Sequence, residues 1–114
     1  YGHAGGDCVL KTMAQRIHQT IRKRDWAARI GGDEMLVVLY GLNELGQAMA
    51  IGEKLRLAAH LPIDFAAQQI TVSISVGVTL ATSAESVDAI IARADKAMYL
   101  AKQQGRDQVM AIPA

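Results

Sequence analysis

The glycine pair Gly31-Gly32 lies between two apolar stretches and is followed at once by two acids, Asp33 and Glu34. Gly-Gly between β-type runs favours a tight hairpin, because such turns need positive φ angles that glycine adopts without a steric cost. Neighbouring side chains of a strand point to opposite faces, so at least one carboxylate is held beside a bare glycine backbone. That arrangement suits a phosphate group bound through Mg²⁺, which prefers a few carboxylates plus phosphate oxygens. An ordinary hairpin with solvated acids is the alternative.

Length and composition are typical of one globular domain, which we expect to comprise residues 1–114. Hydrophobic residues make up 51% of the chain and charged residues 20%,. The net charge of +1 gives no general support for nucleic-acid binding, and the single cysteine, Cys8, excludes an internal disulfide,. No run is apolar enough to span a membrane, so we expect a cytoplasmic domain and leave open a membrane anchor upstream in the full protein.

Hydrophobic periodicity predicts three helices and four strands in the order α-β-β-α-β-α-β. The helices are expected over residues 5–24, 44–59 and 86–104, and the strands over residues 26–30, 35–40, 69–80 and 109–112. Val37-Val38-Leu39 is an unbroken apolar run, which favours a strand buried on both faces,. Gly77 permits a close backbone approach or a bulge in the long third strand,.

Several short motifs occur along the chain, and together, in this order, they resemble the GGDEF domain of diguanylate cyclases. They are Tyr1-Gly2-His3, Gly6-Asp7, Arg22-Lys23-Arg24-Asp25, Ala28 to Glu34, Thr71 to Val78, Arg93 to Tyr99, Ala101-Lys102 and Gly105-Arg106. The resemblance implies an α/β (α+β) fold, with a central, mostly antiparallel sheet flanked by helices. This is the ferredoxin-related, palm-like core of nucleotide cyclases. The family's first strand, with its metal-binding aspartate, and its guanine-binding asparagine are absent from this stretch.

The resemblance implies condensation of two GTP molecules into cyclic di-GMP, with release of two pyrophosphates. Each 3′-hydroxyl attacks the α-phosphate of the other GTP, and two divalent ions, Mg²⁺ or Mn²⁺, can activate the hydroxyl and neutralise charge. Asp33 then corresponds to a metal-binding carboxylate, and Glu34 is a second ligand or an orienting acceptor. Gly31 and Gly32 let the phosphate chain pass close to the backbone.

Three further residues match the family's substrate contacts. Asp7 corresponds to the acceptor for the guanine edge, and capping in the first turn of the helix is its alternative role. Lys102 and Arg106 correspond to triphosphate contacts. Their spacing of four places them on one side of the last helix, where complementing the helix dipole is the alternative.

Arg22 and Asp25 match the family's inhibitory site for cyclic di-GMP. An arginine fork can hold a phosphate or a guanine face, and an aspartate can accept guanine N–H groups. A solvated helix end is the alternative.

Joining two GTP molecules requires a homodimer, and family members often carry an upstream sensor or a downstream phosphodiesterase domain. Met35 stands where the family usually has phenylalanine, a substitution that conserves apolar bulk. Two functions follow as hypotheses. The chain is part of an active cyclase, or it is a degenerate module that binds cyclic di-GMP or GTP without turnover.

Overall fold

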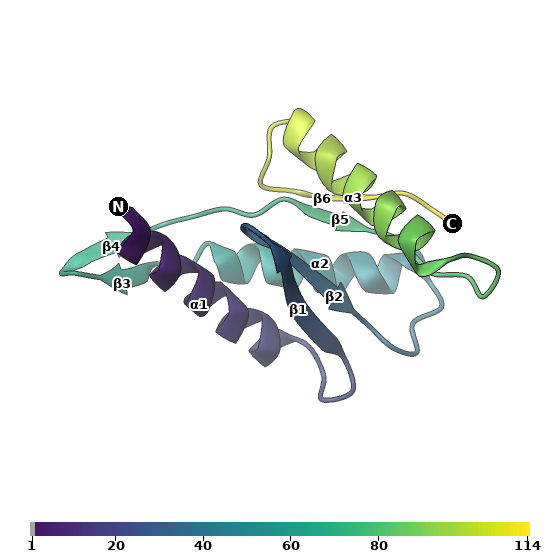
Figure 1. Ribbon diagram of the computed structural model, residues 1–114, viewed down its shortest axis with the longest axis horizontal. Coiled ribbons are helices and arrows are strands. Elements are labelled where there is room, and N and C mark those ends of the chain that lie inside the picture. Colours follow the sequence, from purple (N-terminus) through teal and green to yellow (C-terminus); the bar gives the residue numbers. More distant parts are fainter. Residues whose placement is uncertain (1) are drawn as a thin grey trace.

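A computed structural model describes residues 2–114, which contain three helices and six strands (Figure 1). The elements are α1 (Gly2–Thr20), β1 (Trp26–Gly31), β2 (Glu34–Val38), α2 (Leu45–Ala59), β3 (Ile63–Phe65), β4 (Gln68–Ile70), β5 (Val76–Val78), α3 (Val87–Gln103) and β6 (Val109–Ala111). The α+β class is confirmed. The first helix begins earlier than the periodicity predicts and ends before Arg22, so the Arg22–Asp25 segment is a turn.

The strands form three two-stranded sheets among the described residues rather than one continuous sheet. β1 pairs with β2 and β3 with β4, both antiparallel, whereas β5 pairs with β6 in parallel. Two of the three pairs are therefore antiparallel, as expected for a mostly antiparallel sheet. Figure 1 shows the β1–β2 hairpin in front of α2 and separate from the β5–β6 pair.

The single long strand predicted over residues 69–80 is wrong. β4 ends at Ile70, β5 begins at Val76, and residues 71–75 between them have no strand pairing. A β-branched, alternating sequence forms a strand only where a neighbouring strand accepts its hydrogen bonds. No described strand pairs with residues 71–75, so this segment has the alternating sequence of a strand but not the hydrogen bonds of one.

β3 was missed because its turn lacks the usual sequence signal. Ala66 and Ala67 join β3 to β4 with φ angles of 50° and 62°, positive values that tight hairpin turns require,. Glycine or asparagine normally occupies such positions, whereas alanine gives no indication of a turn there.

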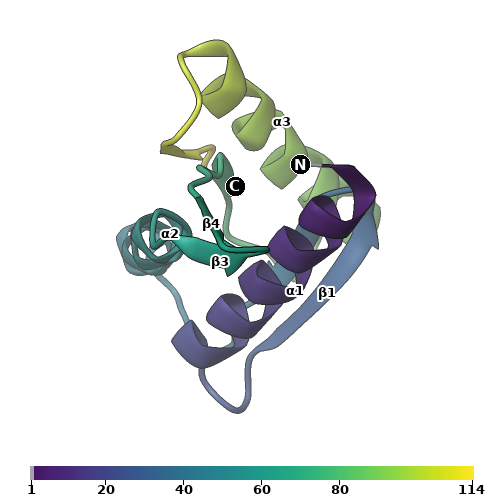
Figure 2. The same ribbon diagram turned by 90° about the vertical axis from the view of Figure 1, so that its left-hand side faces the viewer.

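The β5–β6 pair lies between two helices, as Figures 1 and 2 show. Val76 and Val78 on β5, together with Val109 on β6, meet Gly52 of α2, and Gly77 faces α3. Adjacent strand residues point to opposite faces, so β5 packs against one helix on each side. This layer contains the buried residues Gly52, Ala97 and Ala101.

The close approach predicted at Gly77 is confirmed. A Cβ atom built on Gly77 would lie 2.2 Å from the carbonyl oxygen of Ala94 and 2.3 Å from the backbone nitrogen of Met98. Real Cβ atoms do not approach backbone that closely, so only glycine allows α3 to sit directly on β5.

Arg93, directly beside Ala94, fixes α3 to the segment that follows β5. Its Nε donates to Thr79 Oγ1 at 2.6 Å, its Nη2 donates to the Leu80 carbonyl at 2.7 Å, and its guanidinium pairs with Glu85. The hydrogen bonds from Arg93, and then from Thr82, lower the pKa of Glu85 to about 2. Ser86 begins the helix as expected, accepting from the Ala89 backbone at 3.1 Å.

A second tie joins α1 to the end of α2. Arg16 donates to the carbonyl oxygens of Ala58, Leu61 and Pro62 at 3.1, 2.7 and 3.1 Å. Ala58 lies in the last turn of α2, and Leu61 and Pro62 follow the helix, so Arg16 binds the backbone at the C-terminal end of α2 from a different helix. Met13 and Ile17 are buried on α1, one turn apart, in agreement with the hydrophobic periodicity that predicts this helix,.

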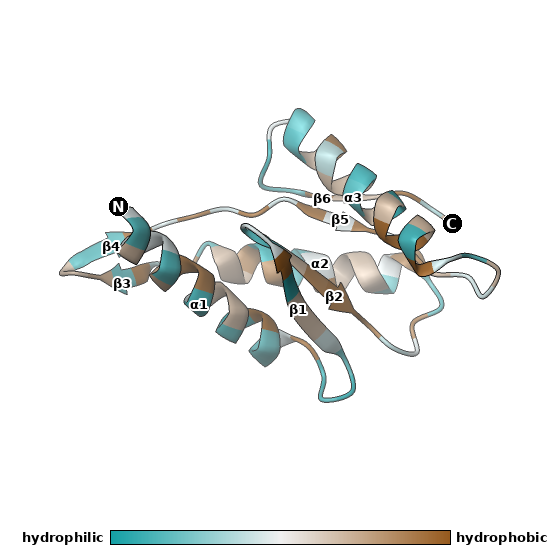
Figure 3. Ribbon diagram, viewed as in Figure 1, coloured by the Kyte–Doolittle hydropathy of each residue, from teal (hydrophilic) through white to brown (hydrophobic). Residues whose placement is uncertain are grey.

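The run Val37-Val38-Leu39 is not buried on both faces. Every residue of β2 is half-buried, although Figure 3 colours much of the strand as hydrophobic. β2 pairs only with β1 among the described residues, which leaves its other edge without a strand. No helix in residues 2–114 combines the length and apolarity needed to cross a bilayer.

Candidate functional site

The hairpin turn is displaced by one residue from its predicted position. Gly31 pairs with Glu34, so Gly32 and Asp33 form the turn, and Gly32 has a φ angle of +50°. A register shift between Arg29 and Gly31 leaves Ile30 unpaired. This bulge takes up one residue, which moves Asp33 out of the strand and to the tip.

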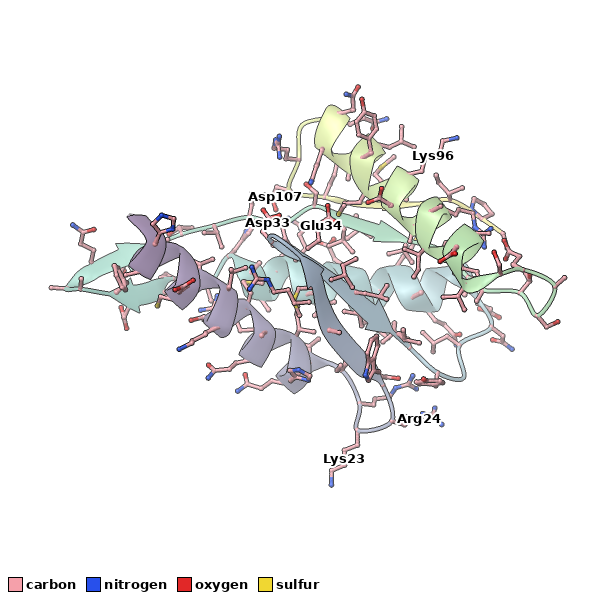
Figure 4. The ribbon with its side chains drawn as sticks, viewed as in Figure 1. Lys23, Arg24, Asp33, Glu34, Lys96 and Asp107 are labelled. Atoms are coloured by element: carbon pink, nitrogen blue, oxygen red, sulfur yellow. The ribbon has the colours of Figure 1, made fainter. Side chains whose placement is uncertain are left out.

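The two acids at the tip are available for a ligand. Asp33 is exposed, Glu34 is half-buried, and within residues 2–114 neither carboxylate has a hydrogen-bond or ion-pair partner. Figure 4 shows both at the end of the β1–β2 hairpin. Carboxylate oxygens are the ligands that Mg²⁺ prefers, so the donors fit a divalent cation in kind. They are too few for a complete site, since the described residues hold no group of three potential metal ligands.

Arg29 is a functional candidate that the sequence reasoning did not single out. Its Nε donates to the Gly32 carbonyl at 2.7 Å, across the turn. This bond fixes the backbone beside Asp33. In the sequence, only the position of Arg29 three residues before Gly32 could have indicated such a role.

Met35 faces the space between the hairpin and α1. A hollow of about 300 Å³ is lined there by Leu10, Lys11, Ala14, His18, Ala27, Ala28, Arg29 and Met35. Met35 therefore lies with the apolar side chains of α1, as expected for a residue that replaces an aromatic ring in a packing role.

Asp7 occupies the second turn of α1, so its expected place in the first turn is wrong. The helix begins at Gly2 rather than at Gly5, and its first turn holds no acid. Capping is thereby removed as the alternative role for Asp7. The side chain is exposed on a hollow of about 490 Å³ between α1 and Phe65, which Lys11 also lines.

Lys102 and Arg106 do not share a helix face. α3 ends at Gln103, and Arg106 follows in a turn where Gly105, Arg106 and Asp107 have φ angles of 113°, 64° and 49°. The four-residue spacing argument applies only within a helix, so the prediction that one helical face presents both cations is wrong. Gly105 follows the cap residue Gln104 with a positive φ, a position at a helix C-terminus that glycine commonly occupies,.

Side chains of α2 hold this turn. Asp107 Oδ1 lies 2.6 Å from His60 Nε2 and accepts from Arg56 Nη1 at 3.0 Å, while Arg56 also pairs with Glu53. The contacts with His60 and then Arg56 hold the pKa of Asp107 below its ordinary value. No sequence pattern predicts this cluster, since His60 and Arg56 lie 47 and 51 positions before Asp107.

Arg22 and Asp25 are bound to each other. The guanidinium donates from Nε and Nη2 to the two carboxylate oxygens, each at 2.9 Å. Asp25 also accepts from the backbone nitrogens of Arg22 and Tyr40 at 2.9 and 3.0 Å, and its side chain is 0% exposed. The bonds from Arg22, and then from Tyr40, hold the pKa of Asp25 well below its ordinary range.

Arg22 keeps an outward face. Its side chain is 40% exposed, and its Nη2 also donates to the Tyr40 carbonyl at 2.6 Å. The pair joins the turn after α1 to Tyr40, two residues after the end of β2. In this conformation the arginine is accessible to a ligand, and the aspartate is not.

The candidate residues lie on separate elements. Figure 4 places Asp33 and Glu34 near Asp107 in that view, whereas Figure 2 shows the blue hairpin and the yellow turn between α3 and β6 on opposite sides. No described hydrogen bond or ion pair joins the hairpin tip to the α3–β6 turn or to Asp7. The structure thus brings Gly31, Gly32, Asp33 and Glu34 together at the hairpin tip and joins Arg22 to Asp25 at its base, while Asp7, Lys102 and Arg106 lie on other segments.

Comparison with known proteins gives a consistent result. The model of the family "Diguanylate cyclase, GGDEF domain" matches residues 1–108. Diguanylate cyclase A of Treponema denticola is 41% identical over 111 residues, which cover 96% of this chain and 30% of that protein. The chain therefore spans less than a third of this relative's length.

Solved structures agree with the sequence match. The GGDEF domain of TpbB from Pseudomonas aeruginosa superposes with a TM-score of 0.91 at 35% identity, covering 96% of this chain and 65% of that one. The GGDEF domain of DgcB from Caulobacter crescentus, solved in complex with cyclic di-GMP, gives 0.87 at 25% identity, covering 97% and 67%. Sequence, fold and the Gly31–Glu34 hairpin together show that this chain belongs to the GGDEF domain family.

Proposed function

We propose that this chain is part of a diguanylate cyclase domain, which condenses two GTP molecules into cyclic di-GMP in a bacterial signalling protein. The observation that carries the proposal is the hairpin tip. Asp33 and Glu34 stand beside glycine backbone and take no part in holding the described fold together. Family membership supplies the reaction class.

Each candidate residue has a separate task in this proposal. Asp33, with Glu34 beside it, holds a divalent cation, Mg²⁺ or Mn²⁺, which when bound lowers the pKa of the attacking hydroxyl and neutralises phosphate charge. Gly31 and Gly32 leave room for the phosphates, and Arg29 fixes the turn carbonyl. Asp7 accepts from the guanine edge, and Lys102 and Arg106 contact the triphosphate from the end of α3.

A preceding strand would complete both the sheet and the metal site. Residues 71–75 have no strand partner, and β2 has a free edge among the described residues. The family's first strand carries a further metal-binding aspartate, and such a strand would find unpaired backbone at both places.

Product analysis of the longer protein that contains this domain tests the proposal. We expect cyclic di-GMP from GTP and Mg²⁺, and at least about a 100-fold loss of product for Asp33→Ala, since a lost charge-stabilising group costs that much in rate. Glu44→Ala, which removes an exposed acid that makes no side-chain cap bond, is the matched control. Substantial product from Asp33→Ala would refute the metal assignment.

The degenerate module is the second candidate function. It is favoured by the incomplete donor set at the hairpin and by the exposed outer face of Arg22. In this version Arg22 holds a phosphate or guanine face of cyclic di-GMP, while Asp25 orients the guanidinium. We expect Arg22→Ala to weaken cyclic di-GMP binding in calorimetry, and unchanged binding would exclude this site.

Catalysis would require a homodimer, because each domain binds one GTP and the reaction joins two. A sensor or phosphodiesterase domain elsewhere in the protein would set when the two domains meet. Sedimentation of the longer protein with and without GTP measures the dimer directly, and a protein that forms product while strictly monomeric would contradict this requirement.

A further inference from the structure

The turn after α3 carries an unusual backbone. Gly105, Arg106 and Asp107 have consecutive φ angles of 113°, 64° and 49°. Only glycine adopts this region freely, so Arg106 and Asp107 are both strained. Such strain persists only where surrounding contacts determine the conformation, and here those contacts can be named.

Asp107 is the main anchor of the turn to the rest of the molecule. Its Oδ1 lies 2.6 Å from His60 Nε2 and 3.0 Å from Arg56 Nη1, both on the last turn of α2 or directly after it. The Arg56 side chain is 18% exposed and is itself held by Glu53. The remaining hydrogen bonds of the turn run from Arg106 N to the Ala101 carbonyl at 2.9 Å, from Gln108 Nε2 to nearby carbonyls, and from Val76 N of β5 to the Gln108 carbonyl at 3.0 Å.

The same contacts decide what Arg106 can do. Asp107 is its immediate neighbour in sequence and would be its natural ion-pair partner. Arg56 and His60 occupy that carboxylate instead, and the Arg106 guanidinium makes no described hydrogen bond or ion pair. The exposed arginine is therefore left free for an anion, and the acid beside it is compensated from α2.

We propose that Asp107, held by Arg56 and His60, is a positioning residue that presents Arg106 to the substrate triphosphate. This inference rests on the proposed function of Arg106 as a triphosphate contact. It adds that the contact depends on α2, on the far side of the β5–β6 pair from α3.

A double-mutant cycle in the longer protein tests the proposal. We expect Asp107→Ala and Arg106→Ala each to raise the KM for GTP about tenfold with kcat little changed, because a displaced contact weakens substrate binding. The double variant should match Arg106→Ala alone. Asp107→Asn should restore most of the affinity, since an amide oxygen can accept from Arg56 and tolerates positive φ. Additive effects, or no effect of Asp107→Ala, would overturn the proposal.

A second measurement separates failure of this inference from failure of the proposed function. Hydrogen exchange at the Arg106 amide, measured without nucleotide, should be at least tenfold faster in Asp107→Ala, while amides in the middle of α3 keep their protection. Unchanged exchange overturns the positioning role even in an active cyclase. If the wild-type protein forms no product, calorimetry with GTP replaces KM. Equal, non-additive losses of affinity then support the proposal, and unchanged affinity in Asp107→Ala overturns it.

Discussion

The β1–β2 hairpin and the layer formed by β5, β6 and α3 use their residues in opposite ways. In the layer, Gly77 brings two backbones into contact, and Arg93, Glu85 and Thr79 form a closed hydrogen-bond network. In the hairpin, β2 is half-buried along its length, and the acids at the tip have no partner within residues 2–114. The polar and small residues of the layer serve packing, whereas the hairpin carries two carboxylates that make no hydrogen bond or ion pair in the described fold.

This difference indicates that a ligand can bind at the hairpin tip without breaking contacts that hold the fold together. Its main tie to the rest of the chain is at its base, where Asp25 and Arg22 bind the backbone of Tyr40. The base of the hairpin is fixed by these hydrogen bonds, whereas the carboxylates at the tip make no described hydrogen bond or ion pair that holds the hairpin. The hairpin can therefore be held in place while Asp33 and Glu34 remain available to a ligand.

The largest effect on stability is expected at Gly77. In Gly77→Ala the new methyl group would meet the backbone of Ala94 and Met98, which cannot move without lifting α3. We expect a loss of more than about 3 kcal/mol in the free energy of unfolding, or failure to fold. Urea denaturation measures it, with Gly46→Ala as control because its Cβ would meet nothing within 4 Å. A variant as stable as the wild type would contradict the close packing.

Removing the tie at the hairpin base should have the next largest effect. Asp25→Ala leaves Arg22 and the Tyr40 amide without their acceptor, and we expect a loss of about 1–3 kcal/mol,. Lys23→Ala, an exposed neighbour, should change stability by less than ~0.5 kcal/mol,. Equal stability of the two variants in urea denaturation would show that the base is not a structural tie.

Acid should weaken the layer through Glu85. Its pKa is lowered from 4.5 to about 2 in the folded protein, so the unfolded chain binds more protons between these values,. The stability that the ionised Glu85 contributes is full above pH 4.5 and is lost as the pH falls towards 2. The stability gap between wild type and Glu85→Gln should therefore close across this interval. Denaturation curves at several pH values test this, and a constant gap would exclude the mechanism.

The smallest effect on stability is expected at the tip. Asp33→Ala removes an exposed carboxylate with no described partner, so the free energy of unfolding should change by less than ~0.5 kcal/mol,. A large loss of stability would mean that Asp33 holds the hairpin together, and the contrast between the two regions would fail.

Local rules predicted the parts of the fold that depend on neighbours in sequence. Ser86 starts α3 and Gly105 ends it, the apolar spacing of Met13 and Ile17 places one face of α1 inward, and Gly77 permits a close contact. Each depends on a backbone preference or a helical period that a few residues carry. The Ala66–Ala67 turn was not predicted because alanine has no preference for positive φ, and the hairpin turn is displaced because the bulge at Ile30, which depends on strand pairing, takes up one residue.

The sequence by itself determined the family, the order of most elements and the identity of the acids, glycines and cations at the candidate site. Only the tertiary structure decided how they are used. Asp25 is enclosed by Arg22 and Tyr40, Arg106 leaves the helix, and Asp107 binds side chains from α2. These outcomes depend on contacts between segments distant in sequence, and the energy of such contacts exists only once the elements have packed.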